Sequence, residues 1–172
     1  MIIDSAPIQT IFNVSILMAD DQCESESQKV SSADAYSSKR PKNIADDFKS
    51  ILFMDDENTL RLVVKLMLER LGYKVTTSQN GQQTIDIYQN QAKLGHPFDV
   101  VILDINIEQG MGGIETFRRL IQIEPNIKAI GASGSVTPET LKSLLQVGFT
   151  RVLAKPFRLE QLKKALEETI CT

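Results

Sequence analysis

The sequence of 172 residues has no tryptophan, one histidine, two cysteines and no apolar run long enough to cross a membrane. The cysteines, Cys23 and Cys171, form no CxxC pair, which excludes a zinc module and a disulfide-stapled secreted scaffold. Lys and Arg number 19 against 22 Asp and Glu, so the net charge of -3 offers no basic footprint for nucleic acid. The amino terminus lacks the basic region of a signal peptide. These absences favour a cytoplasmic protein that neither binds nucleic acid nor inserts into a membrane.

The charge is divided unevenly along the chain. Residues 1–47 carry four basic and eight acidic side chains, whereas residues 48–172 carry 15 basic and 14 acidic ones. The stretch 20–41 is rich in serine and nearly free of large apolar side chains, so it cannot bury enough surface to offset the entropy of folding. We therefore expect a flexible tail or linker over 1–47, with an isolated strand at most over 10–18, and a folded domain over 48–172.

From residue 48 onward, apolar runs alternate with stretches of helical periodicity. Apolar residues spaced by three and four from Leu60 to Leu71 predict a helix, and Thr137 followed by Pro138 marks the start of another. The predicted strands are 50–54, 73–77, 98–104, 127–133 and 150–154. The predicted helices are 60–71, 81–94, one marked by apolar residues over 114–121 and ended by Pro125, 137–148 and 159–170. Apolar strands joined by helices predict a doubly wound α/β fold, with a parallel sheet covered on both faces.

Polar residues stand where these strands end. Asp55 and Asp56 follow the first strand, Asp104 and Ser133 end the third and fourth, and Lys155 follows the fifth. In doubly wound sheets, ligands bind past the carboxyl ends of the strands. Converging carboxylates repel one another unless a cation or protons intervene, and an oxygen site with open water positions suits Mg²⁺. A carboxylate nucleophile, a metal, a lysine and a hydroxyl together predict phosphoryl transfer onto an aspartate.

These motifs resemble the receiver domain of response regulators in two-component signalling. ILFMDDE, VVILDI, AIGAS and VLAKPF stand in the family's order, and the resemblance covers about three quarters of the chain. It implies a flavodoxin-like (βα)5 fold with a five-stranded parallel sheet in strand order 2-1-3-4-5. It also implies a histidine kinase or histidine phosphotransfer protein as phosphodonor and a downstream signalling protein as target. The chain would then be a signalling phosphoacceptor in a phosphorelay and not an enzyme.

The resemblance also assigns roles at the strand ends. It implies that Asp104 accepts the phosphoryl group and that Asp55, Asp56, Asp104 and the backbone carbonyl of Asn106 hold Mg²⁺. Ser133 and Lys155 would contact the phosphoryl group. In this family the peptide bond between the lysine and the following proline is often cis, which is expected here at Lys155-Pro156.

Three features depart from the usual pattern. The loop 107–113 is one residue longer and lacks proline, as in receivers fused to hybrid sensor histidine kinases, and Glu108 adds a negative charge near the phosphosite. Val152 stands where many receivers have an aromatic switch residue. The chain stops after the fifth predicted helix, so we expect no output domain. The run 10–18 is similar to the last strand of a kinase ATP-binding domain, which leaves open a hybrid-kinase fragment or an independent regulator.

Other functions remain as alternatives. A pseudo-receiver would act only through protein contacts, and Glu108 keeps this alternative open. A phosphatase of the haloacid dehalogenase type would also use an aspartate nucleophile, but it normally has a second aspartate where Asn106 stands. A flavodoxin-like cofactor binder needs a phosphate-cradling loop after the first strand, where this sequence has MDDEN. Phosphoacceptor chemistry explains more of the strand-end residues than any of these.

Overall fold

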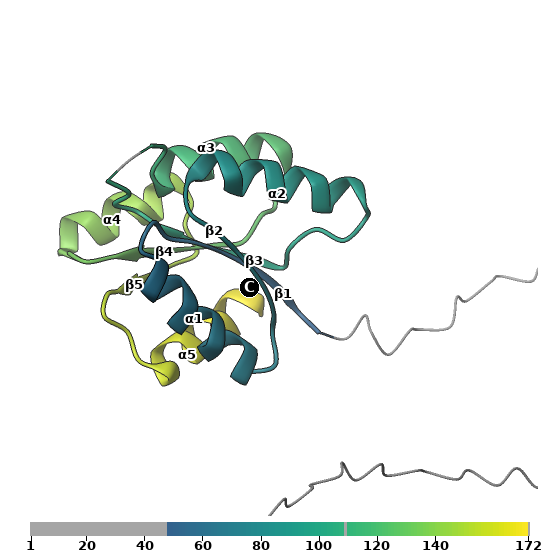
Figure 1. The fold of residues 1–172 in the computed structure, drawn as a ribbon. Coiled ribbons are helices and arrows are strands. Elements are labelled where there is room, and N and C mark those ends of the chain that lie inside the picture. The colour runs from purple at the N-terminus through teal and green to yellow at the C-terminus, as the bar shows by residue number, and fades with distance from the viewer. Residues whose placement is uncertain (1–47, 109, 172) are drawn as a thin grey trace, which may run out of the picture. The chain divides into compact units, whose positions relative to one another are not determined.

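The computed structural model describes residues 48–108 and 110–171 (Figure 1). The strands are β1 (Ser50–Met54), β2 (Lys74–Ser78), β3 (Val100–Asp104), β4 (Ala129–Ser133) and β5 (Arg151–Ala154). The helices are α1 (Asn58–Arg70), α2 (Gly81–Lys93), α3 (Gly113–Ile123), α4 (Pro138–Val147) and α5 (Leu159–Ile170). The tail expected over 1–47 and the strand expected within it lie outside the described residues.

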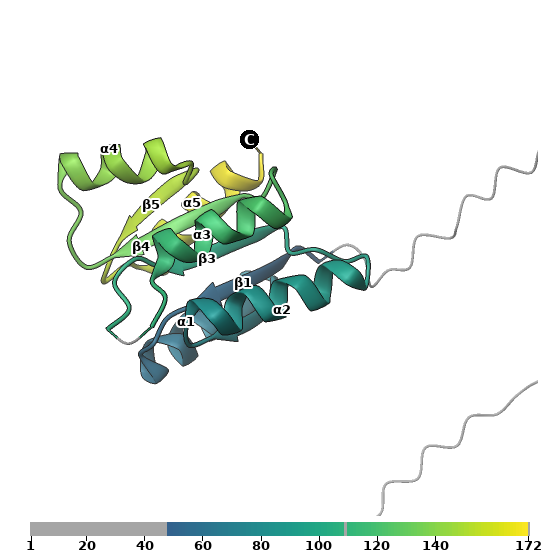
Figure 2. The ribbon, with the colours of Figure 1, turned by 90° about the horizontal axis from the view of Figure 1, so that it is seen from above.

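The five strands form one parallel sheet in the order β2-β1-β3-β4-β5. This arrangement confirms the predicted doubly wound fold and its strand order. Helices α1 and α5 cover one face of the sheet, and α2, α3 and α4 lie side by side over the other (Figures 1 and 2). Among the described helices, none combines the length and the apolar character needed to span a bilayer.

Alternate residues along each strand divide the core into two clusters. Ile51 and Phe53 of β1 point to the layer of α1 and α5, where they pack with Leu68 and Leu166. Leu52 and Met54 point to the other layer, where α2, α3 and α4 contribute their apolar faces. Because successive side chains of a strand face opposite sides of a sheet, a continuous apolar run such as ILFM serves both clusters.

Local signals account for the helix boundaries. The Asn80 side chain caps α2 by accepting a hydrogen bond from the Gln83 N–H, and Thr137 caps α4 through the N–H of Thr140. Helix α4 ends at Val147, and Gly148 after it has a φ of 115°, the left-handed conformation that glycine adopts readily. Side-chain caps at the starts of α2 and α4 therefore compensate unpaired backbone N–H groups in the first turns of these two helices.

Two predicted strands begin two residues too early, and the strands predicted from 73 and 150 each begin one residue too early. The structure starts β3 at Val100, not at residue 98, and starts β4 at Ala129, not at residue 127. Phe98 is buried, and it belongs with Ile127 to the cluster under α2, α3 and α4, although neither residue lies in a strand. These apolar side chains pack in the core just before the first residue of each strand that pairs with a neighbouring strand. An apolar sequence pattern alone does not distinguish such packing from strand pairing.

Candidate functional site

The carboxyl ends of β1, β3, β4 and β5 bring the predicted site residues to one edge of the sheet. Met54 pairs with Leu103, and Asp104 pairs with Ala132, so the residues after β1 and at the end of β3 lie at the same level. The Lys155 N–H donates to the Ser133 carbonyl at 2.8 Å, which fixes the level of the residue after β5. The parallel register alone therefore places carboxylates and a lysine around a common point.

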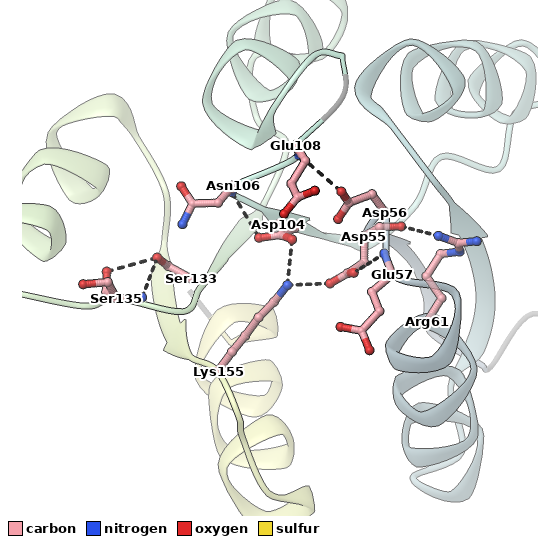
Figure 3. Close-up of polar contacts among 10 residues, drawn as sticks. All are labelled: Asp55, Asp56, Glu57, Arg61, Asp104, Asn106, Glu108, Ser133, Ser135 and Lys155. Atoms are coloured by element: carbon pink, nitrogen blue, oxygen red, sulfur yellow. Dashed lines mark hydrogen bonds and ion pairs between the residues drawn. The ribbon is translucent and has the colours of Figure 1, made fainter.

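Lys155 lies between two buried carboxylates (Figure 3). Its Nζ is 2.5 Å from Oδ2 of Asp55 and 2.7 Å from Oδ2 of Asp104. The side chains are 16% exposed for Lys155, 1% for Asp55 and 6% for Asp104, so water screens these contacts little. The peptide bond between Lys155 and Pro156 is cis, as the resemblance implied. One ammonium group is thus shared by two carboxylates that lie close together.

Asp56 adds a third carboxylate, and it is exposed to solvent. One ligand atom each from Asp55, Asp56 and Asp104 can be chosen so that all three lie within 4.8 Å of one another. Carboxylate oxygens are the ligands that Mg²⁺ prefers, and the open side of the cluster leaves room for the waters that this ion retains. The three acids exceed the single lysine in charge, so the residues present fit a divalent cation.

The electrostatics of the pair follow from burial and proximity. Burial raises the pKa of the Asp104 carboxyl above its usual value, and the neighbouring Asp55 adds to this, although Lys155 and the Asn106 N–H act in the opposite direction. Burial also opposes the charge on Lys155, but the hydrogen bonds to Asp104 and Asp55 outweigh it and raise the pKa of that ammonium. Lys155 therefore stays charged at neutral pH, while the site retains excess negative charge.

Asn106 lies two residues beyond Asp104, at the mouth of the site. Its backbone N–H donates to Oδ1 of Asp104 at 3.1 Å, which turns the chain sharply after the strand. A cavity of about 470 Å³ opens above these residues. Its walls are Asp56, Glu57, Asp104, Asn106, Glu108, Gly134 and Lys155. The predicted site residues, apart from Asp55 beneath it and Ser133 beside it, therefore face one open cavity.

Ser133 is brought to the same edge but not into contact with the carboxylates or the lysine side chain. Its hydroxyl donates to the Ser135 carbonyl at 3.0 Å and accepts from the Ser135 N–H at 3.3 Å. Figure 3 shows this pair apart from the interactions of Asp104 with Lys155. The serine side chain is buried, so its hydroxyl is satisfied within its own loop.

Two residues support the site although the sequence assigned them no role in binding or catalysis: Glu57, which belongs to the acidic run, and Arg61, which was not predicted near the site. The Arg61 guanidinium donates to the Asp55 carbonyl at 2.6 Å and to the Asn58 side chain at 3.1 Å. The Glu57 N–H donates to Oδ1 of Asp55 at 2.9 Å. These bonds hold the turn from β1 into α1 and orient the buried carboxylate. The only signal in the sequence was an arginine one helical turn after the acidic run, which is common on exposed helices.

The loop from β3 to α3 is held tightly against the strand. A Cβ atom on Gly113 would lie 2.5 Å from the Asp104 carbonyl oxygen, so only glycine permits this approach. The Gly81 N–H at the start of α2 donates to the Met111 carbonyl at 3.1 Å. The loop is therefore fixed both to the end of β3 and to the neighbouring helix. Val152, at the position of the aromatic switch residue, packs against the core cluster beneath α4.

Known proteins are similar to most of the part of the chain that forms the sheet and its helices. A family model described as "Response regulator receiver domain" matches residues 51–167. Sporulation initiation phosphotransferase F of Bacillus subtilis is 28% identical over 120 residues, which are 70% of this chain and 92% of that protein. A probable chemotaxis protein CheY of Rhizobium etli is 35% identical over 130 residues, which are 73% of this chain and 94% of that protein.

Longer proteins and solved structures also match. The sensory/regulatory protein RpfC of Xanthomonas campestris is 28% identical over 122 residues, which are 69% of this chain but 16% of that protein. A crystal structure of chemotaxis protein CheY4 from Vibrio cholerae superposes with a TM-score of 0.65 at 27% identity, and covers 71% of this chain and 98% of that one.

Proposed function

This chain belongs to the response regulator receiver domain family, and from that premise we propose that it is a phosphoacceptor that takes a phosphoryl group on Asp104. Receiver domains are signalling modules of two-component systems that bind Mg²⁺ in an acidic pocket and interact with histidine kinases or phosphotransfer proteins. The observation that carries the proposal is the buried carboxylate of Asp104 at the base of an open cavity, beside Lys155 and two further aspartates.

The residues divide the chemistry among them. An Oδ atom of Asp104 attacks phosphorus, the new O–P bond forms, and the bond from phosphorus to the donor's nitrogen or oxygen breaks. Lys155 neutralises charge on the phosphoryl oxygens, which Asp55 and Asp104 alone would repel. Asp55, Asp56, Asp104 and the Asn106 carbonyl would hold Mg²⁺, which would neutralise the charge that gathers on the reacting oxygens.

In this proposal, Ser133 changes its hydrogen-bond partner when Asp104 is phosphorylated. Its hydroxyl now bonds to Ser135, so contact with a phosphoryl group on Asp104 requires it to turn and exchange that partner. Such an exchange shifts the population of the loop between β4 and α4. We propose that residues 48–172 form the receiver unit of a cytoplasmic phosphorelay, with 1–47 as a tail or linker.

The surface beside the cavity suits a phosphodonor protein. Leu62, Val63 and Leu66 of α1 are each more than 40% exposed, so this helix presents apolar side chains to solvent. A groove of about 420 Å³ runs along α1 to Pro156, and it shares Glu57 and Lys155 with the site cavity. A histidine kinase or phosphotransfer protein that packs a helix here would present its phosphohistidine to Asp104.

Labelling with a small-molecule phosphodonor tests the acceptor assignment. We expect acetyl phosphate to label the full chain in the presence of Mg²⁺, and Asp104→Asn to abolish the label. Asp99→Asn, which makes the same change in charge at the opposite edge of the sheet, should be labelled like the unchanged protein. Label that persists in Asp104→Asn refutes the acceptor, whereas no label on the unchanged protein favours the pseudo-receiver alternative.

Transfer from a protein donor tests the α1 surface separately. A panel of purified histidine kinases and histidine phosphotransfer proteins would identify a donor. With that donor, Leu66→Glu should slow transfer by about tenfold or more, because it places a charge within an apolar contact. Labelling by acetyl phosphate should be unchanged, since Leu66 does not line the site cavity. An equal rate of protein transfer would show that the donor docks elsewhere.

A further inference from the structure

Glu108 lies beside the site but belongs to none of the roles assigned so far. It stands in the loop between β3 and α3, and its backbone N–H donates to Oδ2 of Asp56 at 3.2 Å. Figure 3 shows its side chain directed toward the carboxylates of Asp56 and Asp104. The residue lines the site cavity and also a second cavity, beside Asp56, Gln79 and Asn80. Its carboxylate is therefore in place to act on whatever occupies the site.

The position of Glu108 is fixed from both sides. Two residues before it, the Asn106 N–H bonds to Asp104, and three residues after it, the Met111 carbonyl accepts from the Gly81 N–H. The bond to Asp56 holds the residue itself. These bonds hold the backbone on either side of Glu108 and at Glu108 itself, and they place its side chain in the wall of the site cavity.

The charges that line the cavity are strongly unequal. Asp56, Glu57, Asp104 and Glu108 are acidic, and Lys155 is the one basic residue among the lining residues. Lys155 is already engaged by Asp55 and Asp104. Asp56 accepts a hydrogen bond from the Glu108 N–H, which carries no full charge. Glu108 thus adds negative potential on the side of the cavity that Lys155 does not reach.

We propose that Glu108 strengthens the binding of a hydrated divalent cation between Asp55, Asp56 and Asp104, and that it acts through the cation's water molecules. The inference rests on the Mg²⁺ site proposed above. The group of carboxylates that approach within 4.8 Å of one another is formed by the three aspartates and does not include Glu108. Mg²⁺ and Mn²⁺ keep several waters in such sites, and an outer carboxylate accepts hydrogen bonds from them.

This arrangement separates Glu108 from the direct ligands. An outer carboxylate contributes by charge and by accepting from water, so its effect is moderate and weakens with salt. A direct ligand contributes a bond to the ion, and its loss is larger and less sensitive to salt. Glu108 is in these terms a positioning residue, which distinguishes it from Asp56.

Mn²⁺ binding to the full chain, measured from the electron paramagnetic resonance signal of the free ion, tests the proposal without any phosphorylation. At low ionic strength, Glu108→Gln should weaken Mn²⁺ binding by about three- to tenfold, and added KCl should reduce this difference. Glu108→Asp, which keeps the charge, should stay within about threefold of the unchanged protein. Glu69→Gln makes the same substitution at the far end of α1, where Glu69 pairs with Lys65, and should have no effect.

Two outcomes distinguish this inference from the proposed function. Mn²⁺ affinity of Glu108→Gln equal to that of Glu69→Gln would overturn the role of Glu108. Mn²⁺ affinity of Asp56→Asn equal to that of the unchanged protein would overturn the cation site itself. A loss in Glu108→Gln that does not diminish with salt would also contradict an action through water. Far-UV circular dichroism confirms that each variant is folded.

Discussion

The sheet carries aspartate and lysine side chains both at the edge where its strands begin and at the edge where they end, but their charges are balanced differently at the two edges. At the amino-terminal edge, the Asp99 carboxylate accepts from the Ser50 N–H at 2.7 Å and pairs with Lys49 at 2.9 Å. Burial acts to raise the pKa of Asp99, but these bonds outweigh it and the pKa is lowered. At the carboxyl edge, one lysine serves two buried aspartates, and the pKa of Asp104 is raised. The charge of Asp99 is compensated at the amino-terminal edge, whereas the carboxyl edge has more acidic than basic side chains.

The difference shows where a ligand is needed. A carboxylate that has its own lysine and a backbone N–H gains nothing from a bound cation. Two carboxylates that share one ammonium in a buried position stay mutually repulsive, so the protein alone does not minimise their energy. Binding a cation or a phosphoryl group with its cation is favourable there because the fold has left charge uncompensated. Substitutions at matched positions of the two edges therefore test whether their charges are balanced differently.

Removing the lysine from each edge gives the largest contrast. In EDTA, we expect Lys155→Met to lower the free energy of unfolding by about 2–4 kcal/mol, because it leaves two buried carboxylates without a counter-charge. Lys49→Met should lower it by about 1 kcal/mol or less, since that pair is exposed to water. Urea denaturation followed by circular dichroism measures both. Equal losses would show that the two edges do not differ in this way.

Removing a carboxylate from each edge should change stability in opposite directions. In EDTA, Asp104→Asn should raise the free energy of unfolding by about 1–2 kcal/mol, because it relieves repulsion from Asp55 and the cost of burying a charge. Asp99→Asn should lower it by about 1–2 kcal/mol, because the Ser50 N–H and Lys49 lose a charged acceptor. Saturating Mg²⁺ should remove the advantage of Asp104→Asn. A loss of stability in both variants without metal would contradict the excess of acid at the site.

The pH dependence should also differ in sign, with a smaller effect. The pKa of Asp104 is raised by folding, so its contribution is complete below the unfolded pKa of about 3.9 and is lost as pH rises through the folded value. The pKa of Asp99 is lowered, so its contribution is present above about pH 4 and is lost as pH falls through the folded value.

Stability curves in EDTA test these signs. From neutral pH toward pH 4, the advantage of Asp104→Asn over the unchanged protein should shrink, because the unchanged protein becomes neutral at that site. The deficit of Asp99→Asn should persist over this range and shrink only in stronger acid. Parallel curves for both variants would mean that folding shifts neither group as described.

Much of the fold was predictable because two independent signals agreed. The alternation of apolar runs and helical periods gave the order of the elements, and the motifs at the strand ends resembled the receiver family, to which the chain belongs. The convergence of Asp55, Asp56, Asp104 and Lys155 was predictable since parallel strands bring their carboxyl ends to one edge. The starts of β3 and β4 were misplaced because Phe98 and Ile127 pack in the core without pairing.

Other features of the site depend on side-chain geometry that no spacing encodes. The bond of Arg61 to the Asp55 carbonyl requires the arginine to fold back over the first turn of α1. The direction of the Glu108 side chain depends on where the loop crosses Asp56, and a single residue more or less would change it. Ser133 was predicted near the phosphosite, but its bonds to Ser135 follow from the local turn and not from the motif. Tertiary contacts decide these points.

The closed pair of Ser133 and Ser135 bears on signalling in the resting state. Each hydrogen bond of this kind contributes only about 0.5–1.5 kcal/mol net. The arrangement in which Ser133 has turned away from Ser135 is therefore less populated than the closed pair, but it is not absent. A fraction of unphosphorylated molecules therefore adopts the turned arrangement at any moment. If Ser133 signals by this turn, as proposed above, that fraction would give a basal output before any phosphorylation, set by the serine contacts at 3.0 and 3.3 Å. A substitution at Ser135 that keeps the fold would reset this background without touching the acceptor.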